Sequence, residues 1–482
     1  SGWSTAEAAG IRRYQEAIAA WQAAPDTPEQ LASIPRLRLE QVPAEPEKLP
    51  FAEERTAGIT LLCHELHTNG ITYLNFYFAL DDLAPDELTK ASFMARLFGY
   101  LDTSAYALAD LHREMRSLFG SIQFAVEAYG QQNIPTRCRT FLCVTCSVLD
   151  AKLEKALSFL TELLMGQRWD DPERVLVFLR QHRSAMAEQA VMAGHNAAMS
   201  RVLACSTAEG AVQEQAGGIT FLRWLTELER DFPVRFPILA EELKALSQRI
   251  FCRARMTASI TAGNETAVGI TARILSGNLP EGAFVLPGTA AIRPWGPRRE
   301  GIVIPSDVSF SAAGGIFQGA GSGTAKVMGR TISLGHLWNT VRVQGGAYGT
   351  GMILRDTGFA GFFSYRDPSA ARTLDCYRAS AGFLRGIADI DLTGMIIGAA
   401  AESDPLLTAR MKGKTADARY WRQITHGDLC RVRREMLSTV PDDLAVLADP
   451  VEKLTAQGAV CILGSQQQID VCAELLDCVT VL

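Results

Sequence analysis

The sequence lacks the features that mark several large classes of protein. Its 482 residues contain no run of about 18 uninterrupted apolar side chains, which a membrane-spanning helix would need. The start at Ser1 has neither the charged region nor the apolar core of a signal peptide. Lys and Arg number 47 against 53 Asp and Glu, so the net charge of −6 gives no basic surface for nucleic acid. We therefore expect a water-soluble chain with no membrane and no nucleic-acid partner.

The cysteines lack the spacing of a disulfide framework. They number eleven, an odd count, and are scattered from Cys63 to Cys478. This is typical of chains whose thiols stay reduced, so we expect a reducing compartment, the cytosol or an organelle matrix. Because the sequence starts with Ser1 rather than Met, we also expect it to be trimmed or excerpted from a longer one.

Common catalytic motifs are missing too. The sequence has no G-x-S-x-G and no phosphate-binding P-loop. The segment His64-Glu65-Leu66-His67 contains ligand types that zinc prefers, but its spacing matches neither HExxH nor HxxEH, so we interpret it as solvated residues of a hairpin. Cys143 and Cys146 form a single CxxC inside a predicted strand, and we interpret them as core or sheet-face cysteines. No metal ligand is therefore assigned to this chain.

Apolar patterns of strands and helices occur twice along the chain. Apolar runs at 58–63 and 71–80 flank the turn signal Thr68-Asn69-Gly70, which predicts a hairpin. Strands are also expected at 122–128 and 141–149, and helical patterns follow to about residue 250. The second part has a similar order, with strands expected at 301–305, 307–317, 346–354, 358–365 and 459–463, and helices expected at 323–340 and from 466.

Stretches rich in Gly and Pro divide the chain. Residues 1–50 predict a helix over 5–24 followed by a linker, and residues 277–300 form a second linker. The two folded units are then 51–276 and 301–482. Hairpin-connected strands mixed with large helices predict the α+β class, with each unit a mainly antiparallel sheet packed with several helices.

The segment from His336 to Gly349 is the most informative one. Its helical pattern ends in Gly345-Gly346, which suits a left-handed helix cap, and Tyr348 follows at the start of a predicted strand. Arg342 lies in the last helical turn, where it could simply complement the helix dipole. Across the turn it could instead converge with Tyr348, and a cation beside a phenol can grip a peptide carbonyl and stabilise a developing oxyanion.

Residues 337–349, followed by Phe363-Ser364-Tyr365-Arg366-Asp367-Pro368, resemble the C-terminal half of the presequence-peptidase branch of the pitrilysin/insulinase zinc peptidases, which are inverzincins. Residues 25–31 with Ile34-Pro35, and His64-Glu65 with residues 68–71, resemble the same branch. The resemblance implies the fold of mitochondrial processing peptidase and insulinase. It makes residues 1–50 the end of a helical hairpin linker, 51–276 the third domain and 301–482 the fourth domain.

The resemblance also implies a function. In that family two halves close around an unfolded peptide and hydrolyse it, and Arg342 and Tyr348 would be the catalytic residues contributed by this half. Asn339, Gly345 and Gly346 would contact substrate. Zinc, its HxxEH motif and the general base would belong to an N-terminal half, on the same polypeptide or a separate subunit. We expect this chain alone to be inactive, and to act in a bacterial cytoplasm or in a mitochondrial or plastid matrix.

Two other functions remain open at this point. Zinc-free subunits of the same fold serve as a noncatalytic scaffold in a respiratory complex, and a peptide-binding module would capture chains without cutting them. The presence of both Arg342 and Tyr348 in their turn favours the catalytic role, because a scaffold has no need of them.

Overall fold

The computed structural model describes all residues of the chain except 1–3, 25, 57 and 289–290. Parts of the predicted segments 1–50, 51–276 and 277–300 therefore lie outside the described residues. The chain divides into two compact units, Ser1–Pro43 and Ala44–Leu482. The smaller unit contains α1 (Thr5–Ala23), α2 (Pro28–Ala32) and the 3₁₀ turn η1 (Leu39–Gln41). Helix α1 confirms the helix predicted over 5–24, and Ser4 and Glu7 form a capping box at its start.

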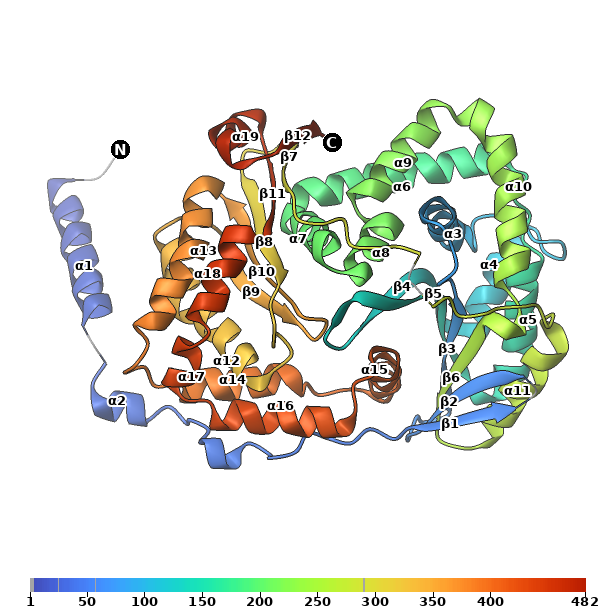
Figure 1. The fold of residues 1–482 in the computed structure, drawn as a ribbon, viewed down its shortest axis with the longest axis horizontal. Coiled ribbons are helices and arrows are strands. Elements are labelled where there is room, and N and C mark those ends of the chain that lie inside the picture. The colour runs from blue at the N-terminus through green and yellow to red at the C-terminus, as the bar shows by residue number, and fades with distance from the viewer. Residues whose placement is uncertain (1–3, 25, 57, 289–290) are drawn as a thin grey trace. The chain divides into compact units, whose positions relative to one another are not determined.

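The first sheet of the larger unit has six strands in the order β1-β2-β6-β3-β5-β4 (Figure 1). Its pairs are antiparallel except for β2 with β6. The strands are β1 (Ala52–Thr56), β2 (Ile59–Glu65), β3 (Ile71–Ala79), β4 (Phe119–Gln131), β5 (Ile134–Leu149) and β6 (Met256–Ala262).

The hairpin predicted between 58–63 and 71–80 is wrong. Both runs are strands, but β6 lies between them, with Ile260 opposite both Cys63 of β2 and Leu74 of β3. The predicted turn is present, with Asn69 at φ 54° and Gly70 at φ 78°. It connects β2 to β3, which are not neighbours in the sheet because β6 lies between them. Both strands are largely buried. Their apolar pattern is therefore as compatible with pairing to a strand from far along the chain as with pairing between β2 and β3.

Helices of the first half cover one face of this sheet. Phe76 and Val144 point into a large apolar core that also contains Leu88, Phe93 and Leu160 from the helices. The helices are α3 (Pro85–Leu97), α4 (Leu108–Leu118), α5 (Leu153–Met165), α6 (Pro172–Met192), α7 (Gly194–Ser206), α8 (Ala208–Gly217), α9 (Ile219–Arg230), α10 (Phe232–Ile250) and α11 (Thr266–Asn278), with 3₁₀ turns η2 (Asp150–Lys152) and η3 (Arg253–Arg255).

The second sheet has six strands in the order β12-β7-β11-β8-β10-β9, and its pairs are antiparallel except for those of β7 with β11 and with β12. The strands are β7 (Arg299–Val303), β8 (Ser309–Ile316), β9 (Gly349–Arg355), β10 (Phe359–Asp367), β11 (Ala459–Gly464) and β12 (Cys478–Val481). The helices are α12 (Gly323–Thr331), η4 (Ile332–Val343), α13 (Ala370–Arg385), α14 (Thr393–Ser403), α15 (Ala409–Arg422), α16 (His426–Ser438), α17 (Pro441–Ala445), α18 (Ala448–Gln457) and α19 (Gln466–Val471), with the 3₁₀ turn η5 (Ala473–Leu475).

Two mainly antiparallel sheets packed with helices confirm the predicted α+β class. The two halves exchange one helix each, so that α15 packs on the first sheet and α7 on the second (Figure 1). Trp421 of α15 lies against Phe141, with ring centroids 4.5 Å apart, and Val202 of α7 shares a core with Phe310 of β8. Among the described helices, none is long and apolar enough to cross a membrane.

Candidate functional site

The candidate site begins with a change of helix type. The helix predicted over 323–340 is α12, which continues without a break into the π-helix η4. The Gln344 N–H donates to the Asn339 carbonyl at 2.9 Å, five residues back, which is the π pattern. Leu337 and Val341 are buried, whereas Trp338 is 41% exposed. π-Helices are rare and occur often at functional sites, because the wider turn displaces side chains from their α-helical positions.

A glycine turn ends η4. The Gly346 N–H donates to the Arg342 carbonyl at 2.9 Å, and the Ala347 N–H donates to Val341 at 3.1 Å. A Cβ on Gly345 would lie 2.3 Å from the Val341 oxygen, and Gly346 has a φ of +83°. Both positions therefore require glycine, and the predicted left-handed cap is confirmed at Gly346. The turn delays the next strand, so β9 starts at Gly349 rather than at the predicted residue 346.

Tyr348 lies between this turn and β9. Its N–H donates to the Tyr365 carbonyl at 3.0 Å, which fixes the backbone beside the edge of the second sheet. Its ring meets the Tyr365 ring edge-on, with centroids 5.7 Å apart. The side chain is nevertheless 67% exposed. Tyr348 is thus held in place at its base while its hydroxyl remains open to solvent.

Arg342 is held by aromatic faces rather than by a carboxylate. Its guanidinium carbon lies 4.0 Å from the centroid of the Trp338 ring and 5.9 Å from that of Tyr348. In the part of the chain that the structure describes, Arg342 has no ion pair. Cation–π contacts orient a guanidinium but leave its N–H donors free. The structure thus brings the half-buried Arg342 and the exposed Tyr348 together as two neighbouring donors.

Asn339, the remaining predicted contact residue, lies one helical turn before Arg342 on η4. Its side-chain amide donates back to the Gly335 carbonyl at 3.4 Å. Sequence reasoning missed Trp338, whose ring carries the guanidinium of Arg342. Its spacing of four residues before Arg342 is the signal that could have found it, because side chains four apart meet on a helix surface.

The interpretation of His64 as a solvated hairpin residue is wrong. His64 is 2% exposed, because α15 covers this part of the first sheet. Its Nε2 lies 2.8 Å from Asp417 Oδ1 and its Nδ1 lies 2.9 Å from the Pro50 carbonyl. Both ring nitrogens are therefore occupied, and this segment does not fit the zinc site of a metallopeptidase.

His64 belongs to a buried polar cluster around Asp417. Asp417 Oδ2 accepts hydrogen bonds from Asn75 at 3.1 Å and from the Tyr77 hydroxyl at 2.8 Å. Burial lowers the pKa of His64, but the hydrogen bond and charge of Asp417, together with the Pro50 carbonyl, outweigh it and raise that pKa above its ordinary value. The cluster fixes α15 on the first sheet, which is a structural role.

Cys143 and Cys146 are buried, as predicted for core cysteines. Burial raises the pKa of Cys143, and it raises the pKa of Cys146 to about 12. Neither thiol is therefore a nucleophile near neutral pH. All eleven cysteines are free, in agreement with the scattered spacing.

Two family models match the chain in succession. The model for the domain associated with subfamily C of the M16 peptidases matches residues 2–228, and the PreP C-terminal domain matches residues 299–466. The second match contains η4, the glycine turn and β9. Neither match includes the segment between residues 228 and 299.

Curated relatives extend this similarity to nearly the whole chain. The chain is 27% identical over 462 residues to the protein HypA of Clostridium perfringens, covering 93% of this chain and 46% of that protein. It is 26% identical over 476 residues to presequence protease 1 of Arabidopsis thaliana, described as chloroplastic/mitochondrial, covering 96% of this chain and 43% of that one. The chain thus spans less than half the length of these relatives.

Solved structures share the fold. A peptidase M16 inactive domain from Pseudomonas fluorescens matches with a TM-score of 0.60 and 16% identity, covering 87% of this chain and 98% of that one. A protease from Helicobacter pylori matches with a TM-score of 0.60 and 12% identity, covering 86% and 100%.

Proposed function

Because the chain corresponds to the C-terminal half of a presequence-protease-like M16 peptidase, we propose that it supplies the zinc-free half of a metalloendopeptidase. In this proposal an N-terminal half, on the same polypeptide or a separate subunit, carries the zinc ion. The two halves enclose a short unfolded peptide in a chamber. Arg342 and Tyr348 of this chain contact that peptide. The curated relatives named presequence protease support this class of substrate.

The observation that carries the proposal is the state of Arg342. The half-buried guanidinium lies on the Trp338 ring and has no carboxylate partner among the described residues, which leaves its N–H donors available to a ligand. This cation is oriented by an aromatic ring and has no ion pair among the described residues. The neighbouring Tyr348 ring, 5.9 Å from the same guanidinium carbon, adds a second donor to the same surface.

The chemistry follows from the donor types. Arg342 offers charged N–H groups and Tyr348 offers one O–H, and both suit a peptide carbonyl that gains negative charge during hydrolysis. Donors held in place before the reaction need no reorganisation when that charge develops. The zinc ion, when bound by the other half, supplies the activated water. Gly345 and Gly346 keep the side chains of Arg342 and Tyr348 together. Asn339 lies on the same helix as Arg342 and contacts the substrate.

The isolated chain is inactive in this proposal. His64, Glu65 and His67 do not form a zinc site, since both ring nitrogens of His64 are already bonded within the protein. Eleven free thiols suit a reducing compartment, a bacterial cytoplasm or an organelle matrix. The mitochondrial and chloroplastic names of the relatives are compatible with an organelle matrix.

The test is peptide hydrolysis by this chain assembled with its zinc-bearing half. Arg342→Ala and Tyr348→Phe should each lower kcat for an unfolded peptide by about 10- to 1000-fold, as expected for loss of one oxyanion donor. KM should change much less, because the lost contact is made in the transition state. Arg113→Ala and Tyr100→Phe, at exposed positions in the first half of the chain, are matched controls and should leave kcat unchanged.

Three results would contradict the proposal. Wild-type kcat in both site variants would show that Arg342 and Tyr348 serve only in helix capping and packing, as expected for a noncatalytic scaffold. Binding of peptide by the assembled halves without any cleavage would instead identify a peptide-binding module. Metal-dependent cleavage by this chain alone, with no other peptidase present, would show that the zinc site has been misassigned.

A further inference from the structure

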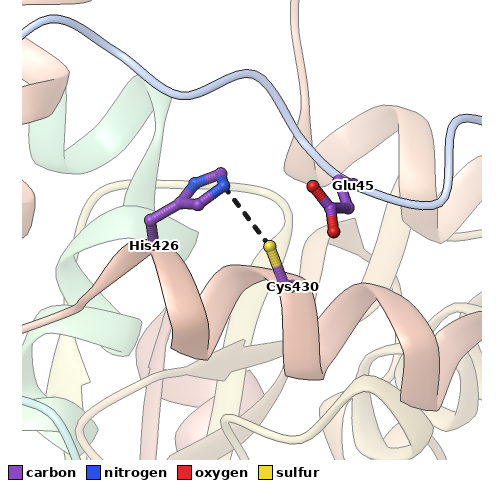
Figure 2. A group of neighbouring side chains, drawn as sticks. All are labelled: Glu45, His426 and Cys430. Carbon is purple, nitrogen blue, oxygen red and sulfur yellow. Dashed lines mark hydrogen bonds between the residues drawn. The ribbon is translucent and has the colours of Figure 1, made fainter.

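A second group of chemically reactive side chains lies outside the turn at Arg342. His426 and Cys430 are one helical turn apart on α16, and Cys430 Sγ lies 3.4 Å from His426 Nε2 (Figure 2). Glu45 approaches them from residues 44–50, which we call the entry segment because they lead to β1. The ligand atoms of Glu45, His426 and Cys430 all lie within 4.8 Å of one another.

The spacing of the two helix residues fits a tetrahedral metal. Zn–S and Zn–N bonds of about 2.3 and 2.0–2.1 Å, at the tetrahedral angle, place sulfur and nitrogen about 3.5 Å apart. The 3.4 Å between Cys430 Sγ and His426 Nε2 is close to that separation. The start of α16 is fixed by a capping box between Thr425 and Asp428, so the His426 backbone is already held in place.

We propose that Glu45, His426 and Cys430 bind one Zn²⁺ ion, with water as the fourth ligand. A thiolate, an imidazole and a carboxylate are the donor set that zinc prefers, whereas magnesium and calcium require oxygen ligands. On binding, the Cys430 thiol gives up its proton to solvent and the sulfur forms a bond to the metal. The carboxylate of Glu45 is exposed, so it can close onto the ion by a small movement of its side chain.

The consequence of binding is mechanical. The entry segment is already tied to α15 by an ion pair between Glu47 and Lys412, with the two atoms 2.5 Å apart, and to β2 by the bond between the Pro50 carbonyl and His64. A metal at Glu45 adds a tie to α16. Zinc would thereby fasten the segment that enters the first sheet to helices of the second half of the chain. This ion is separate from the peptidase zinc and does not depend on the proposed function.

The test uses the zinc-free chain and Co²⁺, whose bond to a thiolate produces an absorption band in the near ultraviolet. Titration should give this band at one Co²⁺ per chain, and Zn²⁺ should displace it. Cys430→Ser should abolish the band, and His426→Ala should weaken binding by at least about 10-fold, since each removes one of three ligands. Cys478→Ser and His67→Ala change exposed residues outside the site and should behave as wild type.

A second measurement does not rely on the cysteine variant being folded. Zn²⁺ should slow amide hydrogen exchange in the entry segment of the wild-type chain and have no such effect in Glu45→Gln. Two results would overturn the proposal. One is a thiolate band of wild-type intensity in Cys430→Ser, and the other is no binding of either metal when it is in large excess over the chain.

Discussion

The two sheets are covered in the same way but with opposite charges. On the first sheet, the exchanged helix α15 brings in the buried carboxylate of Asp417, which is bonded to His64, Asn75 and Tyr77. On the second sheet, the exchanged helix α7 brings in the buried cation of Arg201. Its guanidinium makes two bonds of 2.7 Å to Glu300 of β7 and one of 3.1 Å to Glu214. The first contact contains a histidine whose pKa is raised above its ordinary value, whereas the second consists of a guanidinium and two carboxylates.

The sheets also differ where a helix leads into the edge strand. Helix α4 ends at Leu118 and β4 begins at Phe119 with no connecting loop. In the second half, η4 ends at Val343 and β9 begins at Gly349, and the intervening turn presents Tyr348. Two sheets with related strand order thus have different edges, and the edge of the second sheet carries the half-buried Arg342 and the exposed Tyr348. Fold alone therefore does not determine where the candidate site lies.

The largest effect on stability is expected from removing the buried cation on the second sheet. Arg201→Met leaves Glu300 and Glu214 buried without their partner, which should cost about 3–5 kcal/mol of unfolding free energy. Urea denaturation measures this cost. The control is Arg378→Met, which breaks an exposed pair with Asp375 on α13 and should cost less than about 1 kcal/mol. Equal effects of the two variants would show that α7 is not held by its buried charge.

A smaller effect is expected at the glycine turn, which the first sheet lacks. Gly345→Ala places a Cβ against the Val341 carbonyl, so the turn must shift, at about 1–3 kcal/mol. The shift should move Tyr348 away from Arg342 and lower kcat of the assembled enzyme. Gly382→Ala on α13 meets open space and should stabilise the chain by about 0.5–1 kcal/mol. Wild-type stability and kcat in Gly345→Ala would contradict this account of the turn.

The smallest effect is a pH dependence confined to the first sheet. Because the pKa of His64 is raised above its ordinary value of 6.5, folding favours the protonated ring. This contribution is fully present below about pH 6.5 and is lost as the pH rises through the raised value. Urea midpoints should therefore fall over that range in the wild type, and fall less in His64→Gln. His67→Gln, at an exposed position, should keep the wild-type slope. The same dependence of the urea midpoint on pH in His64→Gln and His67→Gln would show that folding does not change the protonation of His64.

Local patterns were enough to predict the fold class and most elements. Helix α1 and the strands β4, β5 and β10 lie where apolar periodicity placed them, because that periodicity reflects which face of each element is buried. The strand order was not predictable in this way. The insertion of β6 between β2 and β3 depends on pairing over nearly two hundred residues, which no local turn encodes.

The candidate site was predictable only in part. The glycine turn, Arg342 and Tyr348 are close in sequence, so their proximity follows from local geometry. The π-helix and the contact of Trp338 with Arg342 were missed, since a π-turn has no distinctive residue pattern. The burial of His64 and the group of Glu45 with His426 and Cys430 were missed because their partners lie more than three hundred residues away.

The central claim is that Arg342 and Tyr348 act together on the peptide, and a double-mutant cycle on kcat tests it most directly. The assembled enzyme is measured as wild type, Arg342→Ala, Tyr348→Phe and the double variant. We predict that both single variants lower kcat. The double variant should lose less transition-state stabilisation than the two single variants lose together, with a coupling free energy of about 1 kcal/mol or more, as found for residues that act as a unit. Wild-type kcat in all three variants would contradict the account.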